Sequence, residues 1–273
     1  MTPATNNANL PDFMRDDARM GKENISTEDM IVPRVALMQA IHPEVQEGKA
    51  ESGNFFHTVL EEDLGPEVRL VVIHHSKRYT LWRPRHEGGG VLARASDGVN
   101  WDQPGEFEVS PYKDRPKYRV KLQTGRKVGP DVGLGKWGTL DPDNPDSPPA
   151  ATLTHVLVCA DVDNLERGPF VVLLQRSAMK VAKGLLSKIN LDSAPIFGQV
   201  YKMASRSETS ASGDFNQYTF AKDGHVDTAD MYNFLKEQHQ TFSAAGVKYD
   251  EAADQPEDVA SSEDDGNGGD DKY

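Results

Sequence analysis

The chain has 273 residues, 37% of them hydrophobic, and a formal net charge of -13. This length and apolar content can build a sizeable core, which excludes a wholly disordered protein. The one cysteine, Cys159, excludes an internal disulfide framework. No segment reaches the roughly 18 consecutive apolar residues of a membrane-spanning helix, and the first residues lack a signal-peptide pattern. We therefore expect a cytoplasmic protein that does not enter a membrane.

The charge is unevenly distributed along the chain. Residues 250–273 contain ten Asp or Glu and one Lys, whereas the stretch from Arg69 to Lys136 contains fourteen Lys or Arg against seven Asp or Glu. The acidic stretch is also rich in Gly and Ser, so it cannot bury enough apolar surface to offset the entropy lost on ordering. These compositions predict a basic zone in the folded body and a disordered acidic tail over 250–273.

The first part of the chain reads as an arm followed by strands. Residues 1–28 are polar and weakly patterned, which predicts a flexible arm, and "FFHTVL" at 55–60 has the composition of a strand. The β-branched run 68–75 and the alternating segment 77–83 predict two paired strands that turn around Ser76.

Two long connections surround one clearly alternating strand. The Gly- and Pro-rich segments 87–116 and 124–149 predict loops, the first with one short strand. Between them, alternation over "KYRVKLQ" places Lys117, Arg119 and Lys121 on one face of a strand and apolar side chains on the other.

The second half of the chain holds the strongest periodic patterns. Apolar runs predict strands, and apolar residues at helical spacing predict helices. The expected elements are strands 151–162 and 170–175, a helix from 177 to 189 capped by Ser177, a strand pair 199–208 and 215–220, and a capped helix that ends at Gly246.

The order of these elements predicts the fold class. Strands and helices do not alternate as they do in a parallel α/β sheet. We expect a mainly β protein with an OB-fold-like barrel or strongly curved sheet, one inserted helix, one C-terminal helix and the disordered acidic tail. The folded part is treated as one domain over 29–249.

Motifs for catalysis and metal binding are weak. "GPDVGLGKWG" departs from a P-loop because five residues separate Gly129 from Gly135 and Trp137 stands in place of the hydroxyl residue. His74 and His75 are neighbours on a predicted strand and face opposite ways. Cys159 reads as a small buried hydrophobic residue. We therefore expect no enzymatic activity, no cofactor and no metal site.

The basic zone suits binding of single-stranded nucleic acid. Such sites combine a cationic groove along the phosphates with aromatic rings on which bases stack. The candidate residues are the cations and rings of this zone: Arg78, Tyr79, Trp82, Arg83, Arg85, Trp101, Tyr112, Lys113, Arg115, Lys117, Arg119, Lys121, Lys136 and Trp137. Trp101 and Trp137 lie in loops among Gly and Pro, which favours exposed rings over core.

The acidic tail complements this basic zone. A tethered polyanion competes with nucleic acid for a cationic groove because tethering gives a high effective concentration. Once displaced, its acids and its aromatic residue become available to a partner. The expected partner-binding residues are Asp264, Asp265, Asp270, Asp271 and Tyr273.

Several segments resemble one known family. The β-rich body, the helix "SAMKVAKGLLSKI", the strands "YKMASRSE" and "FNQYTF", and the ending "EDDGNGGDDKY" resemble bacteriophage single-stranded DNA-binding proteins of the OB-fold type. Proteins of that family carry an acidic C-terminal tail finished by an aromatic residue. This chain departs from the pattern at Lys272, and its loops 87–116 and 124–149 exceed a minimal OB-fold.

The resemblance implies sequence-independent binding of single-stranded DNA in phage replication or recombination. The tail would regulate binding and recruit a polymerase or a primase-helicase, and the protein would work in the host cytoplasm, with a homodimer left open. Two alternatives also fit a β-rich body with long loops: a virion or assembly protein, and a strand-annealing recombinase.

Overall fold

The computed structural model of the protein describes residues 32–110, 117–210, 213–245, 247 and 249. The expected arm over 1–28, the acidic tail over 250–273 and Gly246 lie outside these ranges. Contacts divide the chain into two compact units, the first formed by 1–76 and 154–250 and the second by 77–153 and 251–273. The sequence predicts one domain over 29–249, and both units contain described residues from that range. Each unit is described separately below.

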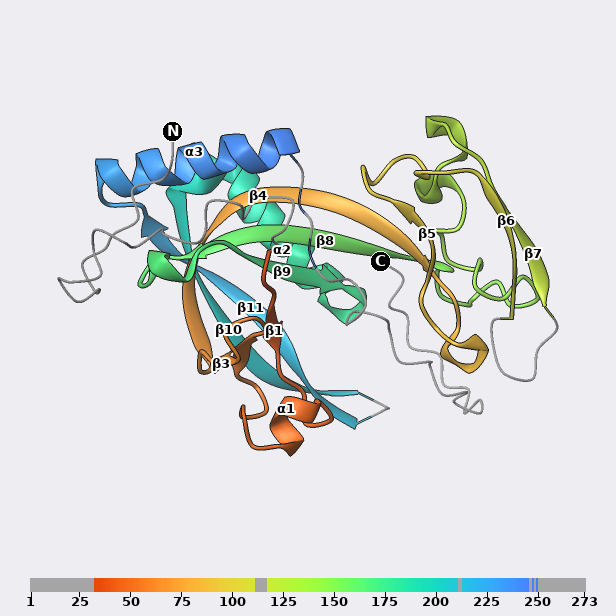
Figure 1. Cartoon of the computed structure of the whole chain (residues 1–273), viewed down its shortest axis with the longest axis horizontal. Coiled ribbons are helices and arrows are strands. Elements are labelled where there is room, and N and C mark those ends of the chain that lie inside the picture. Colours follow the sequence, from red (N-terminus) through yellow and green to blue (C-terminus); the bar gives the residue numbers. More distant parts are fainter. Residues whose placement is uncertain (1–31, 111–116, 211–212, 246, 248, 250–273) are drawn as a thin grey trace, which may run out of the picture. The chain divides into compact units, whose positions relative to one another are not determined.

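The first unit is built on one sheet with the strand order β11-β10-β4-β8-β9 (Figure 1). These strands are β4 (Glu67–Trp82), β8 (Ala151–Asp161), β9 (Phe170–Gln175), β10 (Gln199–Ser210) and β11 (Gly213–His225). The later parts of β4 and the first residues of β8 belong to the second unit. A sixth strand, β5 (Val91–Ala95), also pairs with β4. With β5 set aside, β10 lies beside β4, so β4, β8, β9 and β10 have the spatial order 4-1-2-3 of a Greek key.

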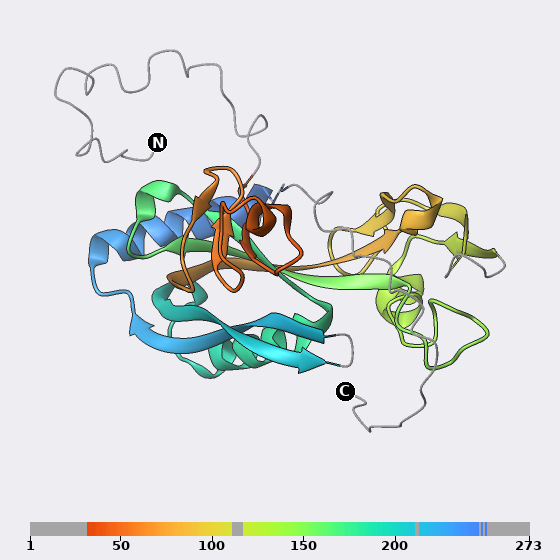
Figure 2. The same ribbon diagram turned by 90° about the horizontal axis from the view of Figure 1, so that it is seen from below.

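Two helices cover the two faces of this sheet. Strand β8, which lies between β4 and β9, alternates between two cores, with Leu157 on one face and Val156 and Val158 on the other. Helix α2 (Met179–Leu191) packs Leu185 into the first core, and helix α3 (Ala229–Ala245) packs Leu235 into the second. Figure 2 shows the two helices on opposite sides of the strands. Burial of β8 on both faces explains its continuous apolar run.

A small sheet lies against the two outer strands of the large one. It has the order β1-β2-β3, formed by Val35–Leu37, Phe55–His57 and Glu62–Asp63, with the short helix α1 (Pro43–Gln46) after β1. Arg34 forms a bridge with Val171 of β9. The Leu37 N–H donates to the Tyr218 hydroxyl of β11 at 3.2 Å. The protein is mainly β, as predicted, but the described strands do not form a closed barrel.

The second unit consists of two strand pairs and a long loop around one core. The end of β4 pairs with β5 (Val91–Ala95), and β6 (Gly105–Val109) pairs with β7 (Tyr118–Leu122). Tyr79, Leu81, Trp101, Val120 and Leu122 belong to the shared core. The remaining regular elements are short 3-10 turns: η3 (Arg85–Glu87), η4 (Arg126–Val128) and η5 (Pro130–Val132) here, and η6 (Leu165–Arg167), η7 (Arg176–Ala178) and η8 (Ile196–Gly198) in the first unit.

Most periodic segments have the predicted secondary structure. The strand pairs β8–β9 and β10–β11 are antiparallel, and α2 buries Ala182 and Leu185 as its spacing predicts. The hydroxyl of Thr228 accepts the Met231 N–H at 3.3 Å and caps α3. The only regular elements in the segment 124–149 are short 3-10 turns, which confirms the predicted loop. Burial raises the pKa of the Cys159 thiol, which is fully buried as expected.

Three local predictions are wrong. No turn occurs at Ser76, because β4 runs through it as one strand of 16 residues. The segment 87–116 contains two strands, β5 and β6, rather than one. Ser177 does not cap α2, since it lies in the η7 turn and Ala178 precedes the first helical residue without a side-chain cap.

Candidate nucleic-acid interface

The loop between β7 and β8 in the second unit has a path fixed by hydrogen bonds. The Gly135 N–H donates to the Pro130 carbonyl at 2.7 Å. The Thr139 hydroxyl lies 2.9 Å from the Leu134 carbonyl and 2.6 Å from the Lys136 carbonyl. The Ala151 N–H in β8 donates to the Leu134 carbonyl at 2.9 Å. This long loop is therefore tied to itself and to the adjoining strand.

Glycines allow the loop to approach the core closely. A Cβ atom on Gly129 would lie 1.9 Å from the Val99 carbonyl oxygen, and one on Gly135 would lie 2.6 Å from the Tyr79 ring. Both distances are shorter than real side chains tolerate, so only glycine fits. The hydroxyl of Tyr118 donates to the Leu140 carbonyl at 2.8 Å, and burial, followed by the charge of Asp141, raises the pKa of Tyr118 to about 12.

This packed loop displays cations and an aromatic ring. Trp137 is 68% exposed and follows the exposed Lys136. Arg126 and Lys127 are exposed in the η4 turn of the same loop. Within the described ranges these three cations form no ion pair. We call residues 125–138 the basic aromatic loop.

Strand β7 presents the predicted cationic face, but acids neutralise part of it. Lys117, Arg119 and Lys121 are exposed while Val120 and Leu122 are buried, which confirms the alternation. Arg119 lies 3.2 Å from Glu106 and 3.5 Å from Glu108 on the paired strand β6. Lys117 lies 3.0 Å from Glu87. The two ion pairs of Arg119 are exposed and contribute only about 0 to 1 kcal/mol each, so phosphate can exchange with them.

The strand pair β4–β5 carries a second group of predicted residues. Along β4, Arg78, Thr80 and Trp82 alternate with the core residues Tyr79 and Leu81. They lie on the outer face of the strand, where Thr80 is buried and Arg78 and Trp82 are half-buried. Arg94 of β5 lies opposite Thr80 and shares this outer face, and the alternation in "VLARA" could have identified it from sequence. Arg83 is exposed directly after β4.

Two of the predicted aromatic residues are core rather than stacking surfaces. Trp101 is 3% exposed and Tyr79 is 9% exposed, and both belong to the core of the second unit. Neither ring therefore has a free face for a base. Trp101 does lie outside the strands, as predicted, but it belongs to the same core cluster as Ala95 of β5 and Val120 of β7. Trp82 is half-buried, and Trp137 is the most exposed tryptophan.

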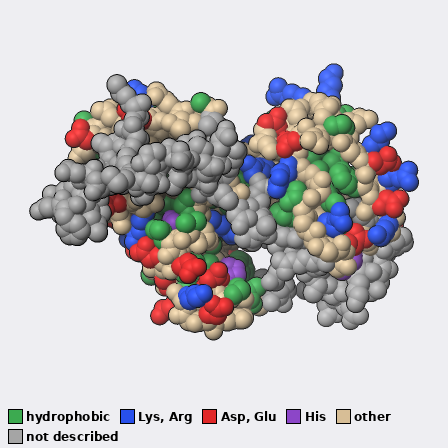
Figure 3. Space-filling view, viewed as in Figure 1, with side chains coloured by type: hydrophobic (Ala, Val, Ile, Leu, Met, Phe, Trp, Pro, Cys, Tyr) green, Lys and Arg blue, Asp and Glu red, His purple; other side chains and the backbone are tan. Residues whose placement is uncertain are grey.

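The structure does not bring all the predicted cations to one surface. The pairs β4–β5 and β6–β7 belong to separate sheets and turn their inner faces to the same core. Arg78 lies on the outer face of one pair, and Lys117, Arg119 and Lys121 lie on the outer face of the other. Figure 3 shows Lys and Arg side chains interleaved with Asp and Glu on the visible face of this unit. Among the described residues, the candidate cations therefore lie on more than one face of this unit.

Some predicted residues lie outside the described part of the chain. These are Tyr112, Lys113 and Arg115, and the tail residues Asp264, Asp265, Asp270, Asp271 and Tyr273. Arg85 begins the η3 turn, but its side chain is likewise outside the described part.

A family model described as Pam3 phage gp34-like protein matches residues 4–248. The chain belongs to the Pam3 phage gp34-like family. This result confirms the expectation of a bacteriophage protein, while the family description names no ligand and no activity. No curated protein and no solved structure matches the chain.

In this member of the Pam3 phage gp34-like family, four of the eight histidines lie in two pairs. His75 Nε2 lies 2.8 Å from His155 Nδ1 on the neighbouring strand, and the rings of His74 and His239 are 6.2 Å apart. Among the described residues, no group of three or more His, Cys, Asp or Glu side chains is arranged to hold a metal ion.

In the part of the chain that the structure describes, no helix has both the length and the apolar character needed to cross a bilayer.

Proposed function

We propose that this phage protein binds single-stranded DNA without sequence preference during phage replication or recombination, and that it does so without catalysis. The observation that carries the proposal is the basic aromatic loop. Trp137 is 68% exposed beside Lys136, in a loop whose path is fixed by packed glycines. An exposed ring held next to cations matches the two requirements of single-strand binding, a stacking platform and a partner for phosphate.

The topology of the first unit supports the same proposal. Its five strands have the Greek-key order described above, and α2 lies between the third and fourth of them in chain order. A five-stranded, partly open Greek-key barrel is the description of an OB-fold, which we propose for this unit. OB-folds bind oligonucleotides with the loop between their first and second strands. The corresponding connection here, residues 83–150, contains the basic aromatic loop.

The acidic tail is assigned a regulatory role in this proposal. Residues 250–273 hold ten acids and lie on the same chain as the exposed cations of the second unit. A tethered polyanion lowers the apparent affinity for phosphate because it competes at high local concentration. The tail would also recruit a replication protein such as a polymerase or a primase-helicase.

Titration of intrinsic fluorescence with oligo-dT tests the proposal. The chain has three tryptophans, and only Trp137 is strongly exposed. Stacking of a base on its ring should therefore quench the fluorescence of the full chain. A Trp137→Phe variant lacks this emission and should lack this quenching. A variant that ends at Lys248 should bind more tightly than the full chain. Absence of quenching and of any affinity at low salt would overturn the proposal, and equal affinity of the two chains would remove the regulatory role of the tail.

An assembly or virion role is the second candidate function. Val128 and Val132 are 41% and 46% exposed in the same loop as Trp137, and exposed apolar side chains also suit contacts between proteins. Strong self-association without quenching by oligo-dT would favour this role. A strand-annealing recombinase would instead quench with oligo-dT and accelerate the pairing of complementary strands.

A further inference from the structure

The turn between β2 and β3 in the first unit exposes two neighbouring aliphatic side chains. Val59 is 64% exposed and Leu60 is 51% exposed, whereas Phe55 and Phe56 of β2 are buried. Adjacent apolar side chains at the tip of a turn are available for contact with another molecule. The turn belongs to the first unit, and the proposed DNA interface does not use it.

Hydrogen bonds hold the base of this turn in place. The Thr58 N–H donates to the Arg34 carbonyl at 2.9 Å, and the Arg34 N–H donates to the Thr58 hydroxyl at 3.1 Å. The Leu60 N–H donates to Nδ1 of the buried His57 at 3.1 Å. Glu61 has a φ of 52°, a left-handed conformation that few non-glycine residues adopt. The tip is therefore held in one conformation, so little conformational freedom is lost when it meets a partner.

Acidic side chains surround the turn. Residues 44–63 contain six Asp or Glu and one Lys. Glu47 and Glu61 are exposed, and Glu47 pairs with Lys49 at 2.8 Å. The hydrogen bond and charge of Glu47, and then the charge of Glu61, raise the pKa of Lys49, so these three side chains lie close together. Figure 3 shows Asp and Glu side chains gathered around α1. We call Glu47 and residues 59–61 the acidic turn.

The chemistry of the acidic turn selects a protein surface as its partner. The carboxylates repel the phosphates of nucleic acids and of anionic membranes. An apolar protein surface flanked by Lys or Arg matches both the aliphatic and the acidic side chains of the turn. Such complementary charges across an interface favour the right partner and exclude wrong ones.

The outer face of helix α2 is a surface of this kind on the same unit. The helix contains three Lys and no Asp or Glu, and Lys180, Lys183 and Lys188 are all exposed. Its last residue, Leu191, is 85% exposed and lies on the same side of the helix as Lys188, three residues before it. The next residue, Asp192, already forms an ion pair with a lysine of β11. Cations therefore accompany an exposed aliphatic side chain on this face.

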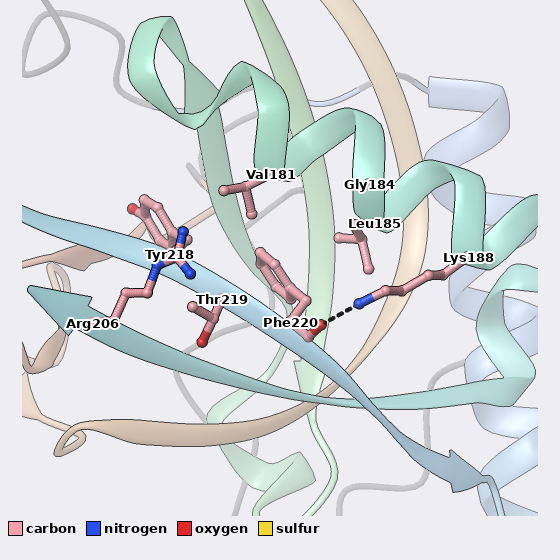
Figure 4. A pocket seen from close by; sticks show the side chains of 8 residues that line it. All are labelled: Val181, Gly184, Leu185, Lys188, Arg206, Tyr218, Thr219 and Phe220. Carbon is pink, nitrogen blue, oxygen red and sulfur yellow. Dashed lines mark hydrogen bonds between the residues drawn. The ribbon is translucent and has the colours of Figure 1, made fainter. Parts of the chain in front are cut away.

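Gly184 leaves room for a partner on the same face. It lies one helical turn from both Lys180 and Lys188. Figure 4 shows it beside Lys188, which reaches β11 and donates to the Phe220 carbonyl at 2.7 Å. A Cβ atom on Gly184 would meet no described atom within 4 Å, so the packing of the described residues does not require glycine here. The missing side chain allows another molecule to approach the helix backbone closely.

We propose that the acidic turn of one copy of this chain docks on the outer face of α2 in a second copy. Val59 and Leu60 pack against Leu191 and the backbone near Gly184, and the carboxylates of the acidic turn face the lysines of α2. The strand β3 and the helix α2 lie apart in both Figure 1 and Figure 2. Since the two surfaces differ, the contact is head-to-tail and leads to a ring or an open filament.

Sedimentation velocity of the full chain, purified without nucleic acid, tests this docking. We expect the sedimentation coefficient to rise with protein concentration. Higher salt should weaken the association, because exposed charges are screened. A chain that sediments as a monomer at every concentration, or an association that strengthens with salt, would overturn the inference.

Variants of the two surfaces provide the matched comparison. Leu60→Asp adds a charge to the apolar tip and Lys183→Glu reverses a charge on α2, so each should weaken self-association by about tenfold or more. Lys236→Glu makes the same charge change on the exposed side of α3 and should have no effect. Thermal melting checks the fold, and Val59→Asp replaces Leu60→Asp if that variant is unfolded. Full association of both surface variants, or its loss in Val128→Asp of the basic aromatic loop, would overturn the inference.

A mixture of the two surface variants distinguishes a head-to-tail contact from a symmetric one. Leu60→Asp retains an intact α2 face, and Lys183→Glu retains an intact acidic turn. The mixture should therefore form a one-to-one complex that grows no further, although neither variant associates alone. Absence of this complex would overturn the head-to-tail docking. The inference goes beyond the proposed function, since neither surface includes the basic aromatic loop and the samples contain no DNA.

Discussion

The side-chain amide of Gln39 forms hydrogen bonds with both main-chain polar groups of Asn216. Its Oε1 accepts the Asn216 N–H at 2.7 Å, and its Nε2 donates to the Asn216 carbonyl at 2.9 Å. The amide thus takes the place that a neighbouring strand would occupy along the outer side of β11. The segment after β1 is thereby fixed to the hairpin β10–β11, 177 residues further along the chain.

Replacement of Gln39 should loosen this attachment. Gln39→Ala leaves two part-buried main-chain groups without these partners, which costs about 1 to 3 kcal/mol for an unsatisfied buried group. We expect faster hydrogen exchange in the segment 213–220 and a lower unfolding midpoint in urea. Gln46→Ala is the control, because Gln46 makes one long exposed hydrogen bond of 3.4 Å. Equal effects of the two variants would contradict this interpretation.

Substitution of Gly135 should disturb the basic aromatic loop. In Gly135→Ala the new Cβ would lie 2.6 Å from the Tyr79 ring and from the Pro130 carbonyl, and relief of such overpacking costs about 1 to 3 kcal/mol. Gly133→Ala is the matched control, since the nearest atom there is 3.5 Å away. Trp137 emission and thermal melting report the result. Similar melting of both variants would show that the loop yields without cost.

Strands and helices with strong local periodicity could be predicted from sequence. The alternation over 117–121 and the helical spacing from Val181 to Ile189 depend on a single core face, which the local pattern records. The missed continuity of β4 also had a local signal, because no Gly, Pro, Asn or Asp lies between Val68 and Trp82.

The candidate interface was less predictable because it depends on contacts between distant segments. Trp101 lies among Gly and Pro, but its burial is set by Val120 and Leu122 of β7. The neutralisation of Arg119 requires the pairing of β6 with β7, which places Glu106 and Glu108 beside it. Counting charges and aromatic residues along the sequence reveals neither the burial of Trp101 nor the neutralisation of Arg119.

Stability should fall as the pH is lowered from about 8 to about 5.5, because buried histidines must take up protons. His57 is 1% exposed, its Nδ1 accepts the Leu60 N–H at 3.1 Å, and burial lowers its pKa. Burial, and then His239, also lower the pKa of His74. Histidines of the unfolded chain take up protons at about pH 6.5. The stabilisation that the neutral histidines give to the folded state is therefore complete above that pH and is lost as the pH falls below it.

Urea unfolding at the two pH values measures this effect. His57→Gln removes one of the groups and should reduce the difference between the two midpoints. His86→Gln, at an exposed position of the second unit, should retain the wild-type difference. A wild-type midpoint that rises toward acid pH would contradict the assignment.

Replacement of Trp137 should weaken oligo-dT binding without affecting the fold. Trp137→Ala removes a stack worth about 1 to 3 kcal/mol, which is about a 5- to 150-fold loss of affinity. Trp137→Phe retains a ring and should bind nearly as well while losing the fluorescence change. Trp137 is 68% exposed, so its replacement should leave the melting temperature nearly unchanged. Full affinity of Trp137→Ala would exclude this ring as a stacking platform.

The salt dependence of binding should distinguish unpaired from paired cations. Each phosphate contact contributes about -0.7 to the slope of log affinity against log salt for single strands. Lys127→Gln and Lys136→Gln should each reduce the slope by about that amount, because both cations are exposed and lack ion pairs in the described ranges. Arg119→Gln should reduce it less, since this side chain already faces Glu106 and Glu108. If Arg119→Gln had the largest effect, the nucleic acid would follow β7 rather than the basic aromatic loop.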